Sequence, residues 1–207
     1  MSKLETNTID TVSGTSTLQV GSTNTTTITL GASGDTINIP SGATIANSGT
    51  ATGFGGANTP AFFAYLSSAQ TGIGDDTNVK IQINTELFDS DGCYDNSTNY
   101  RFTPTVAGKY MLFAQANVDS TAVTNLRATD VRIYKNGSSI AISNINLTEN
   151  MGRILAPSYS IIVDANGTSD YFEVYAQLNT NNSSTFSILG NSTEHRTWFG
   201  GYKIIGA

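Results

Sequence analysis

Short apolar pairs recur through residues 18–39 and constrain the fold more than any other feature of the sequence. In each pair two apolar residues flank one polar residue, and stretches of Thr, Ser, Asn and Gly separate the pairs. The six members are Leu18, Val20, Ile28, Leu30, Ile37 and Ile39. Such alternation is typical of a β-strand with one buried face. Because each strand would be only about five residues long, a single copy of the segment has little against which to bury that face.

The pairs begin at residues 18, 28 and 37, which is the spacing of a degenerate repeat. Repeat units that cannot bury an apolar face alone are covered by neighbouring units or by copies from other chains. So few units would stack into a very thin solenoid, whereas three identical chains wound about one axis would bring each pair beside its own copies. We therefore predict a trimeric, intertwined β-stalk over residues 16–46. The alternative is a flexible, low-complexity tail.

Composition favours β-structure along the rest of the chain as well. Charged residues make up 13% of the 207 residues, and Thr, Ser, Asn and Gly dominate the polar positions. Ser and Asn compete for the hydrogen bonds of a helix, and Thr is β-branched. No long segment shows the 3.6-residue period of an amphipathic helix. These features together predict an all-β protein.

The chain divides into four segments that differ in composition and in the pattern of apolar residues. Residues 1–15 are polar and without pattern, residues 16–46 carry the apolar pairs, and residues 47–60 form a Gly-rich neck. In residues 61–207, which we call the knob, aromatic residues become frequent and apolar residues alternate over longer runs, such as 79–83 and 172–178. Turn signals such as KNG and ANG separate these runs. Many strands joined by short turns over roughly 145 residues predict an antiparallel sandwich or jelly roll.

Four motifs follow one another in the knob: FFAYLSSAQ at 62–70, YDNSTNYRF at 94–102, GKY at 108–110 and WFGGYKI at 198–204. In this order they resemble the globular head of the complement C1q and tumour-necrosis-factor (TNF) superfamily, with one extra residue before Phe102. The resemblance implies a ten-stranded jelly roll that forms compact homotrimers. The motif positions that it assigns to the core are Tyr94, Phe102, Gly108, Tyr110, Phe199 and Gly201.

Two features separate the chain from the animal members of that superfamily. It lacks the Gly at every third residue of a collagen stalk, and its N-terminal MSKLETNTID lacks the apolar stretch of a signal peptide. The LQVG and ITLG units and the Gly-rich neck instead resemble the N-terminal portions of bacteriophage fibre and virion appendage proteins. This resemblance implies a protein that is made in the host cytoplasm and displayed on the virion surface. Residues 1–15 would dock to other virion proteins.

Charge and hydropathy argue against two classes of partner. The formal net charge is −6, and no Lys or Arg lies between Lys3 and Lys80. Nucleic-acid binding needs clustered basic residues, and no apolar run here approaches the length of a membrane span. We therefore predict neither nucleic-acid binding nor membrane insertion.

Residues for catalysis or metal binding are few. His195 is the only histidine, Cys93 is the only cysteine, and no GxSxG motif accompanies the serines. One His and one Cys do not make a zinc site in a single chain, although three copies of His195 about a threefold axis could bind a metal. A lone cysteine also excludes an intrachain disulfide. We predict no enzyme activity, no catalytic residue, no metal site and no cofactor.

Acidic residues beside glycines raise surface calcium as an alternative. The DSDG at 89–92 resembles the start of a calcium loop, but the twelfth position of an EF-hand loop is Glu, whereas residue 100 is Tyr. Asp75 and Asp76 are adjacent carboxylates in a Gly-containing loop. Polar turns are the favoured interpretation at both places, and calcium has no further support.

The leading hypothesis for function is a structural virion appendage protein of a bacteriophage, a short trimeric fibre whose knob adheres to the host surface. Three knobs on one axis raise avidity without any strong single contact. The partner would be a host-surface glycan or protein, and Tyr94, Asn96 and Asn99 are plausible glycan contacts, although no receptor-binding residue is identified.

The alternative function is that of a capsid decoration, cement or head-fibre protein that stabilises the shell. A polysaccharide-degrading tailspike is disfavoured because the knob shows no carboxylate cluster.

Overall fold

The computed structural model describes residues 20, 24, 26–31, 33–46, 58–147, 149 and 151–205. The chain divides into two units, Met1–Thr52 and Gly53–Ala207. All fifteen strands of the described residues lie in the second unit. These residues include no helix, and so none that could cross a membrane. The all-β prediction is therefore confirmed.

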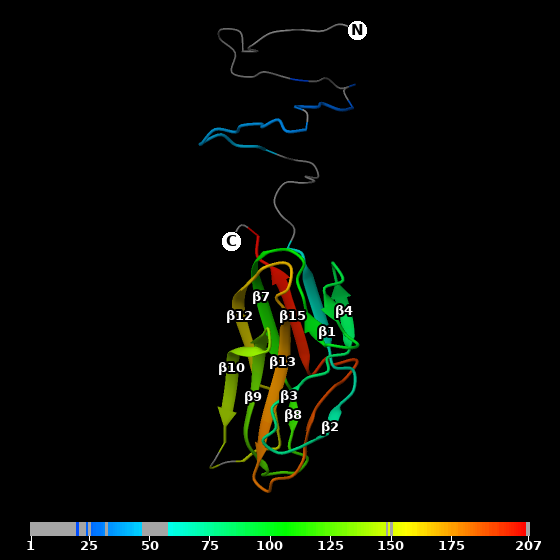
Figure 1. The fold of residues 1–207 in the computed structure, drawn as a ribbon, viewed down its shortest axis with the longest axis vertical. Helices are drawn as coiled ribbons and strands as arrows, with labels where there is room; N and C mark the ends of the chain where they lie inside the picture. The colour runs from blue at the N-terminus through cyan, green and yellow to red at the C-terminus, as the bar shows by residue number, and fades with distance from the viewer. Residues whose placement is uncertain are drawn as a thin grey trace. The chain divides into compact units, whose positions relative to one another are not determined.

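The first sheet of the knob has five antiparallel strands in the order β12-β7-β15-β1-β4 (Figure 1). They are β1 (Ala61–Tyr65), β4 (Thr85–Asp89), β7 (Gly108–Gln115), β12 (Ser158–Ala165) and β15 (Trp198–Lys203). The first and last strands pair, with Ala61 opposite Tyr202 and Tyr65 opposite Trp198. The closing WFGGYKI motif therefore supplies the central strand, drawn in red in Figure 1 between β7 and β1.

The second sheet follows the order β10-β9-β13-β6-β5, and β3 also pairs with β13. Its strands are β3 (Val79–Lys80), β5 (Tyr94–Asp95), β6 (Arg101–Phe102), β9 (Leu126–Lys135), β10 (Ser138–Asn146) and β13 (Phe172–Thr180). A smaller sheet, in the order β11-β8-β14-β2, has the strands β2 (Gln70–Ile73), β8 (Val118–Asp119), β11 (Ile154–Leu155) and β14 (Phe186–Ile188).

The strand order is that of a jelly-roll sandwich, because most neighbours in both large sheets are distant in sequence. The sandwich agrees with the fold expected from the motifs, but the number of strands differs from the ten that the resemblance implies. Seven of the fifteen strands have only two to four residues. Short pieces between turns thus account for the additional strands.

Aromatic rings from both sheets form the centre of the core. Phe62 of the first sheet stacks on Phe102 of the second, with ring centroids 4.3 Å apart, and on Tyr94 at 5.0 Å. Phe199 meets Phe62 edge-on at 4.9 Å. Gly108, which begins β7 with φ 145°, is only partly buried, although the resemblance assigns it to the core. The other motif positions are buried, namely Tyr94, Phe102, Tyr110, Phe199 and Gly201.

Two predicted turns show how local sequence directs the strand connections. Asn136 and Gly137 join β9 to β10 with φ of 52° and 79°, a conformation that Asn and Gly tolerate best. Between β12 and β13, the side-chain oxygen of Asn166 accepts backbone hydrogen bonds from residues 168, 169 and 170. Gly167 has φ 72°, and a Cβ there would collide with the backbone of residues 106 and 107.

In the first unit, no described residue belongs to a strand. Leu18, residues 1–15 and residues 47–57 of the neck lie outside the described residues. The described apolar members of the pairs are between 46% and 65% exposed, namely Val20, Ile28, Leu30, Ile37 and Ile39. One chain alone thus leaves these side chains uncovered. The trimeric β-stalk stays a prediction.

Candidate functional site

Aromatic side chains gather on the outer face of the first sheet. The register places Gly200 between Phe63 of β1 and Phe113 of β7, and it places Trp198 beside Tyr65. The ring centroids of Phe63, Phe113 and Trp198 lie 5.8–6.4 Å apart. We call this surface the aromatic face and define it by Phe63, Tyr65, Phe113, His195, Trp198 and Tyr202.

The aromatic face arises because the strands of the first sheet carry apolar residues on their outer side as well as on the side that faces the core. On β1, Phe62 points into the core and Phe63 points outward. The rings of Phe63 and Phe113 cover Gly200, where an added Cβ would collide with Phe113. Tyr202 and Ile162 extend the surface and are 39% and 58% exposed. Because contiguous apolar surfaces can mark interaction sites, the aromatic face is a candidate for one.

His195 belongs to the aromatic face. Its ring centroid lies 4.0 Å from that of Tyr65 and 6.4 Å from that of Phe63. Its backbone N–H donates to the carbonyl of Asn191 at 3.1 Å. In the described part of the chain, no group of three or more His, Cys, Asp or Glu residues is placed to hold a metal ion. The side chain of His195 therefore packs against aromatic rings within one chain.

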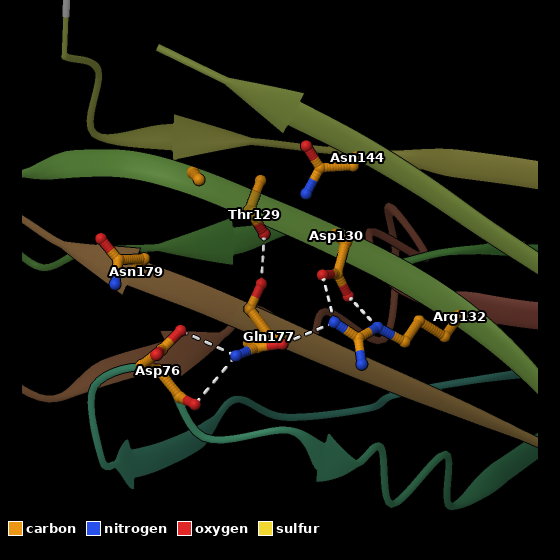
Figure 2. A pocket seen from close by; sticks show the side chains of 8 residues that line it. Asp76, Thr129, Asp130, Arg132, Asn144, Gln177 and Asn179 are labelled. Carbon is orange, nitrogen blue, oxygen red and sulfur yellow. Dashed lines mark hydrogen bonds and ion pairs between the residues drawn. The ribbon is translucent and has the colours of Figure 1, made fainter. Parts of the chain in front are cut away.

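A polar cavity of about 200 Å³ lies on the outer face of the second sheet (Figure 2). Its lining residues are Asp76, Ala128, Thr129, Asp130, Arg132, Asn144, Gln177 and Asn179. In the register of β10, β9 and β13, Asp130 lies between Asn144 and Gln177, and Ala128 lies beside Asn179. The small side chain of Ala128 leaves space among longer polar neighbours.

Arg132 organises one wall of the polar cavity. Its Nε and Nη2 donate to the two carboxylate oxygens of Asp130 at 2.9 and 2.7 Å, and Nη2 also donates to Gln177 Oε1 at 2.6 Å. Gln177 Nε2 in turn donates to the carbonyl and Oδ1 of Asp76 at 2.9 and 2.7 Å. The hydrogen bonds to Asp130 raise the pKa of the Arg132 guanidinium. This network holds four polar groups in place.

The acidic residues considered for calcium stabilise turns and loops within the chain. Asp89 accepts hydrogen bonds from the backbone N–H groups of Tyr94 at 2.7 Å and of Asp91 at 3.3 Å. Asp75 Oδ1 accepts from the backbone N–H and the hydroxyl of Thr180 at 2.6 and 2.8 Å. These contacts agree with the polar-turn interpretation. The expected lack of a cofactor stays a prediction.

Of the three plausible glycan contacts, Tyr94 does not suit that role. It is buried, and its hydroxyl donates to the carbonyl of Ile83 at 3.0 Å. Burial raises the pKa of this hydroxyl, and the nearby Glu86 raises it further. Asn99 Nδ2 donates to Asp95 at 2.7 Å, and Asn96 is partly exposed. Its burial agrees with the core position that the motif resemblance assigns to Tyr94, and it argues against a contact with a glycan.

The polar cavity and the aromatic face were both missed by the sequence patterns. The cavity draws residues from a loop and from three strands, so no local motif marks it. The adjacent Phe62 and Phe63 are the one weak sequence signal of the aromatic face. In a strand with only one buried face, apolar and polar residues alternate, so two large apolar residues in a row indicate that both faces are apolar.

Many solved structures are similar to this chain, whereas no model of a known protein family and no curated protein sequence matches it. Eiger TNF from S. frugiperda shares 8% identity, with 72% of this chain and 95% of that chain covered and a TM-score of 0.48. The globular domain of zebrafish complement 1qA shares 15% identity, with 70% and 98% covered and a TM-score of 0.42. Murine APRIL shares 11% identity, with 70% and 99% covered and a TM-score of 0.45. The likeness is one of fold.

Proposed function

We propose that this chain is a structural virion appendage protein of a bacteriophage, a homotrimeric short fibre whose knob adheres to the host surface. The observation that carries the proposal is the aromatic face, a group of neighbouring rings that one chain leaves partly exposed. The exposed apolar pairs of the first unit support the same assembly.

The aromatic face suits other copies of the same chain. The rings at its centre carry no formal charge, so pressing identical faces together removes apolar surface from water without desolvating unpaired ions. The ion pair of Lys109 with Asp164, 2.8 Å long, lies toward one edge of the sheet, where solvent still reaches both side chains. An apolar centre with a charged rim is the usual composition of a stable interface.

The N-terminal part of the chain resembles the part of fibre proteins that docks to the virion. The knob would then face outward, and we therefore assign adhesion to the knob. Three knobs on one axis present three copies of every surface site. Weak individual contacts then add up when the receptors are close enough to be engaged together. No step of this function requires a catalytic group.

Particles that lack the protein test the proposal. We expect such particles to adsorb to host cells several-fold more slowly while their heads remain intact, and we expect labelled protein to locate to the tail. Unchanged adsorption together with fragile heads would contradict the adhesive role. That result would favour the alternative, a capsid decoration or head-fibre protein built on the same trimer.

A further inference from the structure

The side chains around the polar cavity match a ligand rich in hydroxyl groups. Asp76 and Asp130 supply acceptors, and Arg132 supplies donors. Asn144 and Asn179 border the same hollow from β10 and β13, and each amide offers both a donor and an acceptor (Figure 2). Because a hydroxyl both donates and accepts, such a mixture satisfies it better than carboxylates alone would.

The groups of the cavity are arranged before any ligand arrives. The side chains of Asp130 and Arg132 are 6% and 23% exposed, and their two hydrogen bonds fix the guanidinium plane. By contrast, the side-chain amides of Asn144 and Asn179 make no hydrogen bond within the described part of the chain. A ligand would therefore meet a rigid wall, which lowers the entropy cost of binding, and two amides whose donors and acceptors are available to it.

Size and charge narrow the class of ligand. The cavity volume of about 200 Å³ is below the roughly 300–1,000 Å³ of pockets for drug-sized molecules, so one small unit fits it. Arg132 compensates Asp130, which leaves Asp76 as an acidic group without a cationic partner among the lining residues. An anionic ligand is disfavoured beside that carboxylate.

An aromatic pair extends the site along the same face. Tyr175 lies opposite Arg132 in the register of β13 and β9. Its ring stacks on that of Tyr134, with centroids 4.2 Å apart, and both rings are partly exposed. Rings of this kind offer a flat apolar surface with a polar hydroxyl tip. The apolar face of a second sugar ring would rest there while the first occupied the cavity.

We propose that the polar cavity binds one neutral sugar ring of a host-surface glycan, with Asn144 and Asn179 as the amides that hydrogen-bond its hydroxyls. This inference deepens the proposed adhesive function and rests on it for the source of the glycan. The binding of the sugar itself follows from the geometry of the cavity.

Titration of the full chain with methyl glycosides of glucose, galactose, mannose, N-acetylglucosamine and N-acetylgalactosamine tests the site by calorimetry or NMR. We expect at least one glycoside to bind in the millimolar range and sialic acid not to bind. Asn179→Leu should weaken binding at least tenfold, since the larger apolar side chain fills the hollow. The matched control Asn58→Leu should bind as the wild type does, because Asn58 is exposed and lies outside the cavity.

Asn144→Ala provides a second variant on another strand, and melting temperatures equal to that of the wild type show that both variants fold. Three results would each overturn the site: no glycoside binding by the wild type, preference for sialic acid, or unchanged affinity in both variants.

Binding of the protein to host cells separates the site from the proposed function. We expect the wild type to bind cells and Asn179→Leu to bind them at least tenfold less. Equal binding of cells by both proteins would overturn the cavity as the receptor site while adhesion stands. Glycoside binding as predicted, without any binding of the wild type to cells, would overturn adhesion while the sugar site stands.

Discussion

At the residue scale, Asp95 shows how one carboxylate fixes a turn. Its oxygens accept hydrogen bonds from the backbone N–H groups of Ser97, Thr98 and Asn99 at 3.1, 2.9 and 3.1 Å. The bonds from Thr98 and Ser97 are the main cause that holds the pKa of Asp95 well below its usual range. The YDNSTNY motif thus contains the residues that form its turn, because an Asp side chain readily accepts hydrogen bonds from the backbone N–H groups that follow it.

This turn predicts a pH dependence of stability. Because the folded-state pKa of Asp95 lies below its ordinary value of 3.8, its contribution is present above that pH and is lost as the pH falls toward the folded-state pKa. Urea unfolding at pH 7 and at pH 3 should show a larger loss of unfolding free energy in the wild type than in Asp95→Asn, whose side chain does not titrate. Equal losses in the two proteins would contradict this role of Asp95.

At the element scale, alternation predicted the strands well where one face is buried. The run at Val174, Ala176 and Leu178 lies on β13 with all three side chains buried. The run from Val79 to Ile83 became only the two-residue β3, although Ile81 still donates its N–H to the carbonyl of Val174 at 2.9 Å. Periodicity reports burial, whereas strand length depends on partners that come from elsewhere in the chain.

The aromatic face yields a prediction at this scale. Phe113→Glu places a charge at the centre of the face, where burial in an interface leaves it without a partner. We expect the assembly to fall apart to single chains at micromolar concentration while the circular dichroism spectrum of the knob is retained. Val123→Glu is the matched control, because Val123 is 73% exposed and belongs to the loop between β8 and β9, not to the aromatic face. Its mass should equal that of the wild type, and a similar mass for Phe113→Glu would show that this face is not needed to hold the chains together.

The apolar pairs yield a second prediction. Exchange of both Ile28 and Leu30 for Asp puts carboxylates where copies of the two side chains would meet about the proposed axis. Limited proteolysis should cut residues 16–46 at least several-fold faster in this variant than in the wild type, and the knob should melt at the same temperature. If the stalk segment of the variant resists proteolysis as well as that of the wild type, the two side chains do not contact their own copies about the axis.

At the scale of the whole molecule, the sequence was sufficient for the fold class and insufficient for the surfaces. The order of the motifs led to the jelly roll, because buried rings such as Phe62, Phe102 and Phe199 have to meet in one core. The polar cavity required the register of β10, β9 and β13, which no single segment encodes. The proposed assembly involves further chains, so only the exposure of apolar side chains points to it.

The most direct test of the account is the mass of the purified full chain in solution, by sedimentation or light scattering at micromolar concentration. The homotrimer predicts about 65 kDa, three times the chain mass of 21.8 kDa. A stable mass of 21.8 kDa under the same conditions would contradict the trimer. The aromatic face and the apolar pairs would then need a different partner.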